Sequence, residues 1–206
     1  VQGSLDAKWR ASPELVIDGT LKPDFSQVAL DVPQLSGNTA FALYLPEKRP
    51  FFFESSDLLH SPTEALYTRS FTAPRWGVRS TWRGAALAGT AFVIDDKGGG
   101  QVLLPYGYGT DTALQPGSRS LSARVHADLD DAARFELGGI LAARRYEGGR
   151  GDNAVAGPDI AWQVDDAWRV RAQWLRSQTT AQPFTDPASG DVSLVRGRTT
   201  TGDSVF

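Results

Sequence analysis

Apolar and polar residues alternate with a period of two along much of the second half of the chain. The pattern is clearest between residues 159 and 174, where it is interrupted only by the polar turn Asp165-Asp166. A period of two places successive side chains on opposite faces of a β-strand. This stretch therefore predicts a β-hairpin with one apolar face and one polar face.

Three earlier stretches repeat this unit. They run over residues 121–141 around Asp130-Asp131, over 76–92 around Arg83-Gly84, and over 7–21 around Ser12-Pro13. The return segment of the first contains Gly138-Gly139, and each glycine costs a helix ~1 kcal/mol, so a strand is favoured there. The residues 202–206 predict the opening of one further strand.

The predicted turns are short at one end of the hairpins, and longer polar connections join the hairpins at the other end. Such an arrangement is typical of outer-membrane β-barrels, and it also occurs in soluble β-sandwiches. The fold class is therefore all-β with antiparallel up-and-down hairpins, forming part of an outer-membrane β-barrel or, alternatively, a soluble β-sandwich. Residues 22–75 do not alternate, and we expect a plug, loop or capping segment there. The longer connections are expected at residues 95–100, 106–118, 147–158 and 179–202.

Five tryptophans lie near predicted strand ends on the apolar faces. Outer-membrane barrels carry aromatic girdles at both membrane interfaces, and these positions match such girdles. Ordinary core tryptophans are the alternative interpretation. The five residues are Trp76, Trp82, Trp162, Trp168 and Trp174.

Composition removes several functional classes. The 206 residues include no Cys, which excludes disulfide frameworks and thiolate chemistry. A formal net charge of -3 provides no basic surface for nucleic acid. The longest apolar runs are too short for a transmembrane helix. Because the chain begins at Val1 and has neither Met nor a signal peptide, we expect a piece of a longer protein.

The irregular segment carries three blocks that resemble a known family. They are 22–28 (KPDFSQV), 46–54 (PEKRPFFFE) and 67–69 (YTR). These blocks are similar to those of domain of unknown function family 5916, in which an N-terminal carbohydrate-binding-like sandwich precedes a barrel-like C-terminal region. The resemblance places this chain early in that barrel region. It departs from the family pattern at Ala42, Ser55-Ser56 and Ser70, where charged residues or glycine are usual.

The charges beside the phenylalanine run are the strongest candidate site. Glu47, Lys48, Arg49 and Glu54 flank three phenylalanines, and they suggest a clasp that anchors the rings while its charges pair with polar groups. The alternative is a ligand-selecting constriction inside a barrel. Further arginines on polar strand faces would line the same lumen. These arginines are Arg124, Arg169 and Arg171, and Arg69 of the irregular segment is a further candidate for the lumen.

Catalysis is not expected. The carboxylates Asp24, Glu47, Glu54 and Asp57 have no spacing that identifies a glycosidase pair. The two histidines lie far apart, and the repeated Asp-Asp pairs are explained by turn chemistry. We therefore expect neither a metal nor a cofactor.

Together these features predict a segment of an outer-membrane β-barrel that acts in a pore, in transport or in surface assembly linked to saccharides. The expected location is the bacterial outer membrane. The expected partners are outer-membrane lipid and a saccharide ligand or other surface proteins, without nucleic acid. The alternative is a secreted β-sandwich that binds or processes carbohydrate through exposed tryptophans.

Overall fold

The computed structural model of this chain shows one large antiparallel sheet. It describes residues 3–23, 49–63, 65–66, 68–99, 101–106, 109–114, 116–130, 134–180, 184–185, 192–193 and 199–206. Over these residues, no helix has the length and apolar character needed to cross a membrane.

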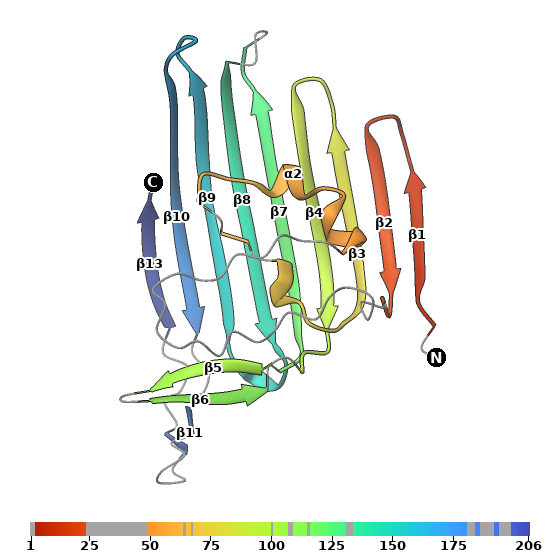
Figure 1. Cartoon of the computed structure of the whole chain (residues 1–206), viewed down its shortest axis with the longest axis vertical. Helices are drawn as coiled ribbons and strands as arrows, with labels where there is room; N and C mark the ends of the chain where they lie inside the picture. Colours follow the sequence, from red (N-terminus) through yellow and green to blue (C-terminus); the bar gives the residue numbers. More distant parts are fainter. Residues whose placement is uncertain are drawn as a thin grey trace.

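The sheet has nine strands in the order β1-β2-β3-β4-β7-β8-β9-β10-β13 (Figure 1). All neighbouring strands are antiparallel, so the predicted all-β, up-and-down fold class is confirmed. Within the described residues the sheet is open, with β1 and β13 at its edges. The strands are β1 Leu5–Arg10, β2 Leu15–Leu21, β3 Pro74–Arg83, β4 Leu87–Asp96, β7 Ser118–Asp128, β8 Phe135–Tyr146, β9 Asp152–Gln163, β10 Arg169–Thr180 and β13 Thr199–Val205.

All four predicted hairpins are confirmed, as the pairs β1/β2, β3/β4, β7/β8 and β9/β10. Their turns lie together at one end of the sheet, which we call the upper end as in Figure 1. Aspartate stabilises two of these turns through its own side chain. Asp130 Oδ1 accepts hydrogen bonds from two backbone N–H groups, and Asp165 Oδ1 accepts two more. The predicted strand at 202–206 is also confirmed, because β13 pairs with β10.

The predicted long connections are partly wrong. The strand β6 (Gly109–Leu114) lies where a polar loop was expected at 106–118, and it forms a separate hairpin with β5 (Gln101–Tyr106). The connection 147–158 is a short turn containing the 3₁₀ helix η2 (Glu147–Gly149), because β9 already begins at Asp152. Within 179–202 lie the two-residue strands β11 (Phe184–Thr185) and β12 (Val192–Ser193).

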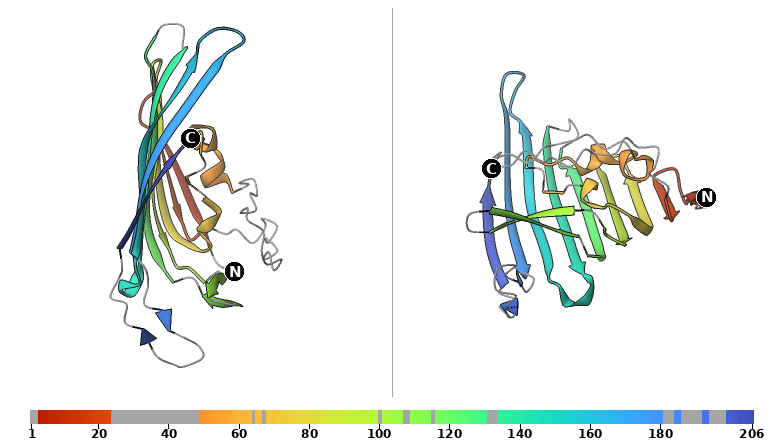
Figure 2. Two further views of the ribbon diagram at one scale, coloured as in Figure 1. Left: turned by 90° about the vertical axis from the view of Figure 1, so that its left-hand side faces the viewer. Right: turned by 60° about the horizontal axis from the view of Figure 1, so that its bottom comes forward.

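Residues 49–73, which we call the strap, cross one face of the sheet. The strap contains α1 (Pro50–Phe53), α2 (Ser56–Leu59) and the 3₁₀ helix η1 (Thr68–Ser70). Figure 2 shows both helices on the same side of the sheet. We call the face beneath the strap the inner face and the opposite one the outer face. Residues 24–48 of the predicted irregular segment lie outside the described residues.

The polarity of the sheet is inverted relative to an ordinary globular domain. Among the described residues, 7 hydrophobic side chains are buried, whereas 15 polar or charged residues are buried and 21 large hydrophobic residues are exposed. Monomeric soluble proteins rarely expose large contiguous apolar patches. The small hydrophobic core that exists lies between the strap and β4, around Phe52, Phe71, Phe92 and Ile94.

Candidate functional site

The backbone of the strap is held to the inner face by side chains from five strands. Two of its carbonyl groups accept hydrogen bonds from buried arginines: Phe51 O from Arg79 on β3, and His60 O from Arg124 Nε on β7 at 3.3 Å. A third, Ser70 O, accepts from Arg144 Nη2 on β8 at 3.1 Å.

Two further strands accept hydrogen bonds from backbone N–H groups of the strap. Gln173 Oε1 on β10 accepts from Thr63 N at 2.7 Å. The fully buried carboxylate of Asp96 on β4 accepts from Thr72 N at 3.0 Å and Ala73 N at 2.8 Å. Because the strap lacks regular pairing with the sheet, these side chains satisfy its buried backbone groups.

The phenylalanine run anchors the strap through an aromatic cluster. The Phe52 ring stacks on Phe71 with centroids 5.7 Å apart and meets Phe92 of β4 edge to face at 6.0 Å. Arginines close the cluster on both sides, since the Arg49 guanidinium lies 4.3 Å from the Phe52 ring centroid and that of Arg144 lies 4.6 Å from Phe71. Arg49 also donates to the carbonyl groups of residues 68 and 71.

The three phenylalanines of the run differ in their surroundings. Phe52 is buried, and Phe51 packs over Gly77, where a Cβ atom would lie 3.0 Å from Phe51 Cζ. The side chain of Phe53 is exposed. The rings of Phe51 and Phe52 therefore anchor the strap. The absence of a side chain at Gly77 on β3 leaves room for the Phe51 ring.

Glu54 ties the strap to the first hairpin through a four-residue ion network. Its Oε2 atom lies 2.5 Å from Lys8 Nζ on β1 and 2.9 Å from Arg79 Nη2 on β3. Arg79 also binds Asp18 of β2 at 2.6 Å. The hydrogen bond from Lys8, with help from Arg79, holds the pKa of Glu54 below its ordinary range. These contacts are those that a clasp requires.

Acidification should weaken this network. A carboxylate with a lowered pKa in the folded state adds stability above its unfolded pKa, and loses that contribution as pH falls through the folded value. We expect Glu54→Gln to be less stable than wild type at pH 7, and the difference to vanish below the ordinary glutamate range. Denaturant unfolding at several pH values measures this difference. Glu136→Gln on β8 is the matched control, and an equal pH dependence in the two variants would contradict the role of Glu54.

Asp57 is the second described carboxylate of the strap and the last of the catalytic candidates that the structure describes. It forms a bidentate pair with Arg83, both distances being 2.8 Å, and the hydrogen bonds from Arg83 lower its pKa. A glycosidase general acid needs a raised pKa so that it stays protonated. Both described strap carboxylates are shifted in the opposite direction, which suits ion pairing rather than proton donation.

Among the ion pairs between described residues, the most deeply buried joins Arg124 of β7 to Asp159 of β9. Arg124 Nη2 lies 2.7 Å from Asp159 Oδ1, and both side chains are 2% exposed. The pair passes over β8 at Gly138, where a Cβ atom would overlap the guanidinium. Asp159 Oδ2 and Gln173 Nε2, which belong to directly paired residues, have no hydrogen-bond partner. Gln173, whose Oε1 accepts a hydrogen bond from Thr63 N of the strap, is thus also the register partner of the buried Asp159.

Gly138 is therefore expected to be essential for this ion pair. Gly138→Ala should lower the free energy of unfolding by about 1–3 kcal/mol, because overpacking displaces a buried charge. Gly139→Ala is the matched control, since a Cβ atom there would approach no atom more closely than 3.9 Å. Denaturant unfolding measured by tryptophan fluorescence compares the two variants. Equal effects at both positions would show that the Arg124–Asp159 pair does not need the space above β8.

The outer face carries an almost continuous apolar band. On eight of the nine strands, β13 being the exception, the side chains opposite the inner face are apolar or small over a segment of five to nine residues. We call this surface the outer band. Its limits are Leu5 to Trp9 on β1, Leu15 to Leu21 on β2, Trp76 to Trp82 on β3, Leu87 to Val93 on β4, Leu121 to Leu129 on β7 and its turn, Phe135 to Ala143 on β8, Ala154 to Trp162 on β9 and Trp168 to Trp174 on β10.

The outer band climbs diagonally across the register of the sheet. Following paired residues from β1, Trp9 leads to Arg176 on β10 and Leu5 leads to Thr180. The band ends on β10, however, at Trp168 and Trp174. The upper border has thus shifted by eight residues and the lower border by six over the seven steps from β1 to β10. With ~3.4 Å per residue along a strand and ~4.8 Å between strands, the band is inclined by about 35° to the direction of the strand pairing.

Charged residues follow the lower border of the outer band on six strands. We call this row the charged border. On β4, β7, β8, β9 and β10 the charged residue is the next outward-facing residue beyond the outer band, and on β13 Asp203 is the register partner of Arg176. Its members are Asp95, Arg119, Arg145, Asp152, Arg176 and Asp203.

All five predicted tryptophans lie on the outer face, and all are exposed. Trp82, Trp162 and Trp168 lie at the upper border of the outer band. Trp76 and Trp174 lie at its lower border. A sixth, Trp9, also belongs to the upper border and was missed because the first hairpin alternates weakly.

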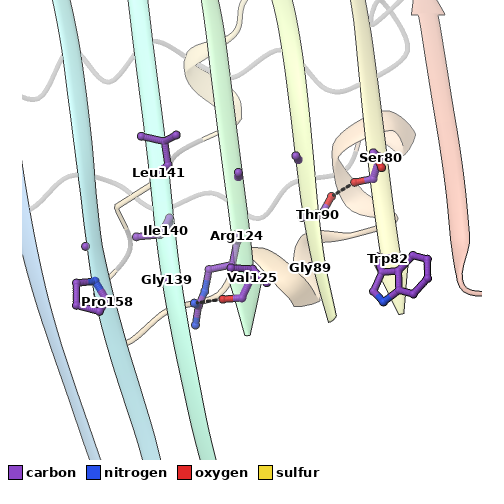
Figure 3. A pocket seen from close by; sticks show the side chains of 13 residues that line it. Ser80, Trp82, Gly89, Thr90, Arg124, Val125, Gly139, Ile140, Leu141 and Pro158 are labelled. Atoms are coloured by element: carbon purple, nitrogen blue, oxygen red, sulfur yellow. Dashed lines mark hydrogen bonds between the residues drawn. The ribbon is translucent and has the colours of Figure 1, made fainter. Parts of the chain in front are cut away.

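The middle of the outer band is hollowed where glycines replace larger residues. A hollow of about 510 Å³ extends from Trp82 across Gly89, Val125 and Gly139 to Pro158 (Figure 3). A Cβ atom on Gly89 would lie 2.7 Å from the Arg124 carbonyl oxygen, so the backbones approach closely there. The surface of the band is therefore apolar but uneven.

The structure places the remaining predicted residues as follows. Glu47 and Lys48 lie outside the described residues, and Arg69 is described only through the backbone of η1. Arg169 and Arg171 are exposed on β10 and are not brought to the strap. Sequence reasoning missed several residues that hold the strap, although their alternation with apolar residues was visible. They are Asp18, Arg79, Asp96, Arg144, Asp159 and Gln173.

Across the described ranges, no group of three His, Asp or Glu residues could hold a metal ion. Of the paired aspartates, Asp95 binds Arg75 and Arg119, and Asp96 binds backbone N–H groups of the strap. Of the other two pairs, Asp130 and Asp165 bind backbone N–H groups at turns, as predicted, and Asp131 lies outside the described residues.

The fold and the two faces define an all-β protein whose sheet has an apolar exposed side and a polar side covered by a strap. The family model described as domain of unknown function (DUF5916) matches residues 1–74, which confirms the family resemblance over this range. The matched range contains β1, β2 and the strap. No curated protein and no solved structure matches the chain.

Proposed function

We propose that this chain forms part of the membrane-embedded wall of a bacterial outer-membrane β-barrel. In this proposal the outer band faces lipid, and the inner face lines the lumen, with the strap lying inside it. The observation that carries the proposal is the inverted polarity of the sheet. Outer-membrane barrels have an apolar exterior and a polar interior, because lipid replaces water outside and water or a plug fills the inside.

The geometry of the outer band supports this proposal. Strands of outer-membrane barrels are tilted by ~35–45° from the barrel axis, and the band climbs across the strands by about 35°. Its length along β7 and β8 is nine residues. With that tilt, nine residues span about 20–25 Å, similar to the ~25 Å apolar belt of such barrels. The tryptophans at both borders occupy the positions of the aromatic girdles.

The position of the strap across the inner face favours a plugged barrel over a wide diffusion pore. It contacts β3, β4, β7, β8 and β10 through buried or half-buried side chains, so it lies along most of the described inner face. A role in gated transport or surface assembly agrees with this geometry better than free diffusion does. A link to saccharides rests on the family resemblance and on the carbohydrate-binding-like domain that this resemblance implies.

The short turns and long connections suggest an orientation. Outer-membrane barrels place short turns in the periplasm and longer loops outside the cell. The upper end of the sheet, with the turns of four hairpins, would then face the periplasm. The charged border would lie near the outer leaflet.

Fractionation of cells that produce the intact protein tests this proposal. We expect it in the outer membrane after a carbonate wash and expect it to need detergent to remain monodisperse. Heating a detergent-solubilised sample should also shift its electrophoretic mobility as the folded sheet unfolds. A folded protein that remains monomeric in buffer without detergent would contradict the proposal and favour the soluble β-sandwich.

A further inference from the structure

Two arginines lie directly opposite each other on the outer face. Arg119 of β7 and Arg145 of β8 are register partners within the charged border. Directly opposed like charges destabilise an antiparallel pair, because their side chains are close neighbours. Both are exposed, the Arg119 side chain by 78%. The sheet thus holds two cations together at the edge of the outer band.

Neighbouring carboxylates leave part of this charge available. Asp95 binds Arg119 through Nε at 3.0 Å, and the same carboxylate binds Arg75 at 2.7 Å. Asp152 is the register partner of Arg145 on the other side, but the two form no ion pair. The terminal nitrogens of both arginines are therefore placed for an additional anion between β7 and β8.

An apolar hollow adjoins the two arginines. It has a volume of about 380 Å³, and its lining includes Arg119, Arg145, Asp152 and the neighbouring part of the outer band. The apolar lining residues are Val93, Leu121, Ala143 and Ala154. The site thus combines an apolar floor with a charged rim in which two exposed arginines outnumber one aspartate, and these chemistries match the acyl chain and the phosphate of a lipid.

We propose that Arg119 and Arg145 bind the phosphate of a phosphorylated membrane lipid, with an acyl chain of that lipid in the adjoining hollow. This inference rests on the proposed membrane location of the outer band. Arginine suits the role because its planar guanidinium donates paired hydrogen bonds to phosphate oxygens. A bound phosphate also removes the repulsion between the two opposed cations.

Binding of short-chain lipids to the intact protein in a neutral detergent tests the site. Native mass spectrometry would compare dioctanoyl phosphatidic acid, dioctanoyl phosphatidylcholine and inorganic phosphate as probes. We expect phosphatidic acid to bind at least tenfold more tightly than either of the others. Lipid A is a second phosphorylated probe, and its affinity relative to phosphatidic acid distinguishes a glycolipid from a glycerophospholipid as the preferred source of the phosphate.

The double variant Arg119→Gln/Arg145→Gln should lose the preference for phosphatidic acid at least tenfold. The control Arg10→Gln/Arg150→Gln removes the same charge from exposed positions outside the hollow and should keep the preference. The single variant Arg145→Gln leaves the Arg119–Asp95 pair intact and should lose part of the preference, which covers the case of a double variant that fails to fold. Equal binding of phosphatidylcholine, equal binding of inorganic phosphate, or an unchanged double variant would overturn the inference.

The same probes separate this inference from the proposed function. Dioctanoyl phosphatidic acid dissolves as a monomer, so its binding can be measured whether or not the protein needs detergent. A detergent-requiring protein without phosphate preference would overturn the lipid site alone. A protein that is soluble without detergent and still prefers phosphatidic acid would overturn the membrane location and retain an anionic-lipid site.

Discussion

Replacing Arg124 by Met should lower the free energy of unfolding by about 3–5 kcal/mol, because it leaves the Asp159 carboxylate buried without its cation. The substitution also removes the hydrogen bonds to His60 O and Val125 O. Part of the loss should therefore appear in the strap. Equilibrium unfolding in detergent or bilayers, followed by tryptophan fluorescence, measures it.

Two further variants make this prediction specific. The double variant Arg124→Met/Asp159→Leu should regain most of the lost stability, because an apolar pair of similar size often replaces a buried ion pair without cost. Arg171→Met, which removes an exposed arginine of the inner face, should change stability by less than about 0.5 kcal/mol. If Arg124→Met also fell within that limit, the pair would be solvated rather than buried.

Replacing Val125 by Arg should cost about 2–4 kcal/mol in a bilayer, although Val125 is 47% exposed in the isolated chain. Val125 lies at the middle of the outer band on β7, halfway between Leu121 and Leu129. An arginine there would bring its charge to the centre of the hydrocarbon layer. Unfolding measured in lipid vesicles gives the cost.

Leu129→Arg is the matched control for depth. Leu129 lies at the upper border of the band, where an arginine reaches the interface, so its cost should be about 0–1 kcal/mol. A soluble sheet with this face in water would tolerate both substitutions within about 0.5 kcal/mol. Equal tolerance at the two positions would contradict a lipid-facing band.

The hairpins were predictable because alternation is strong where large residues occupy the outer face. Trp162, Trp168 and Trp174 mark β9 and β10 in this way. The start of β9 was missed because Ala154 and Ala156 are the outward residues there, and small residues give little contrast with their polar neighbours. Gly151 and Pro158 on either side also suggested a loop, yet proline is tolerated inside β9 at the place where its pairing with β10 is interrupted.

The candidate site was predictable in only a few of its residues, and its pairings were not predictable. Glu54 and Arg124 were identified as candidates, but their partners come from other strands. Asp159 reaches Arg124 only across Gly138, and Lys8 reaches Glu54 only because β1 lies beside β2. Alternation shows which face a residue occupies, whereas these contacts depend on strand order and register.

The diagonal course of the outer band is also invisible without the register. In the sequence, Trp174 lies near the end of an alternating stretch, but β10 continues to Thr180. Trp174 is a border residue only because the whole band has climbed along β10 relative to β1. The same shift places the charged border below it at Arg176.

The lipid-facing outer band is tested most directly by spin labels along β7. The chain contains no Cys, so single cysteines at residues 121, 123, 125 and 127, with 120 and 122 as inward-facing comparisons, can each carry a nitroxide label. In bilayers, the four outward labels should be accessible to oxygen and protected from a water-soluble nickel complex, with the strongest protection near Val125. Nickel access at Val125 would place this face in water, and protection from both reagents would place it against a second sheet.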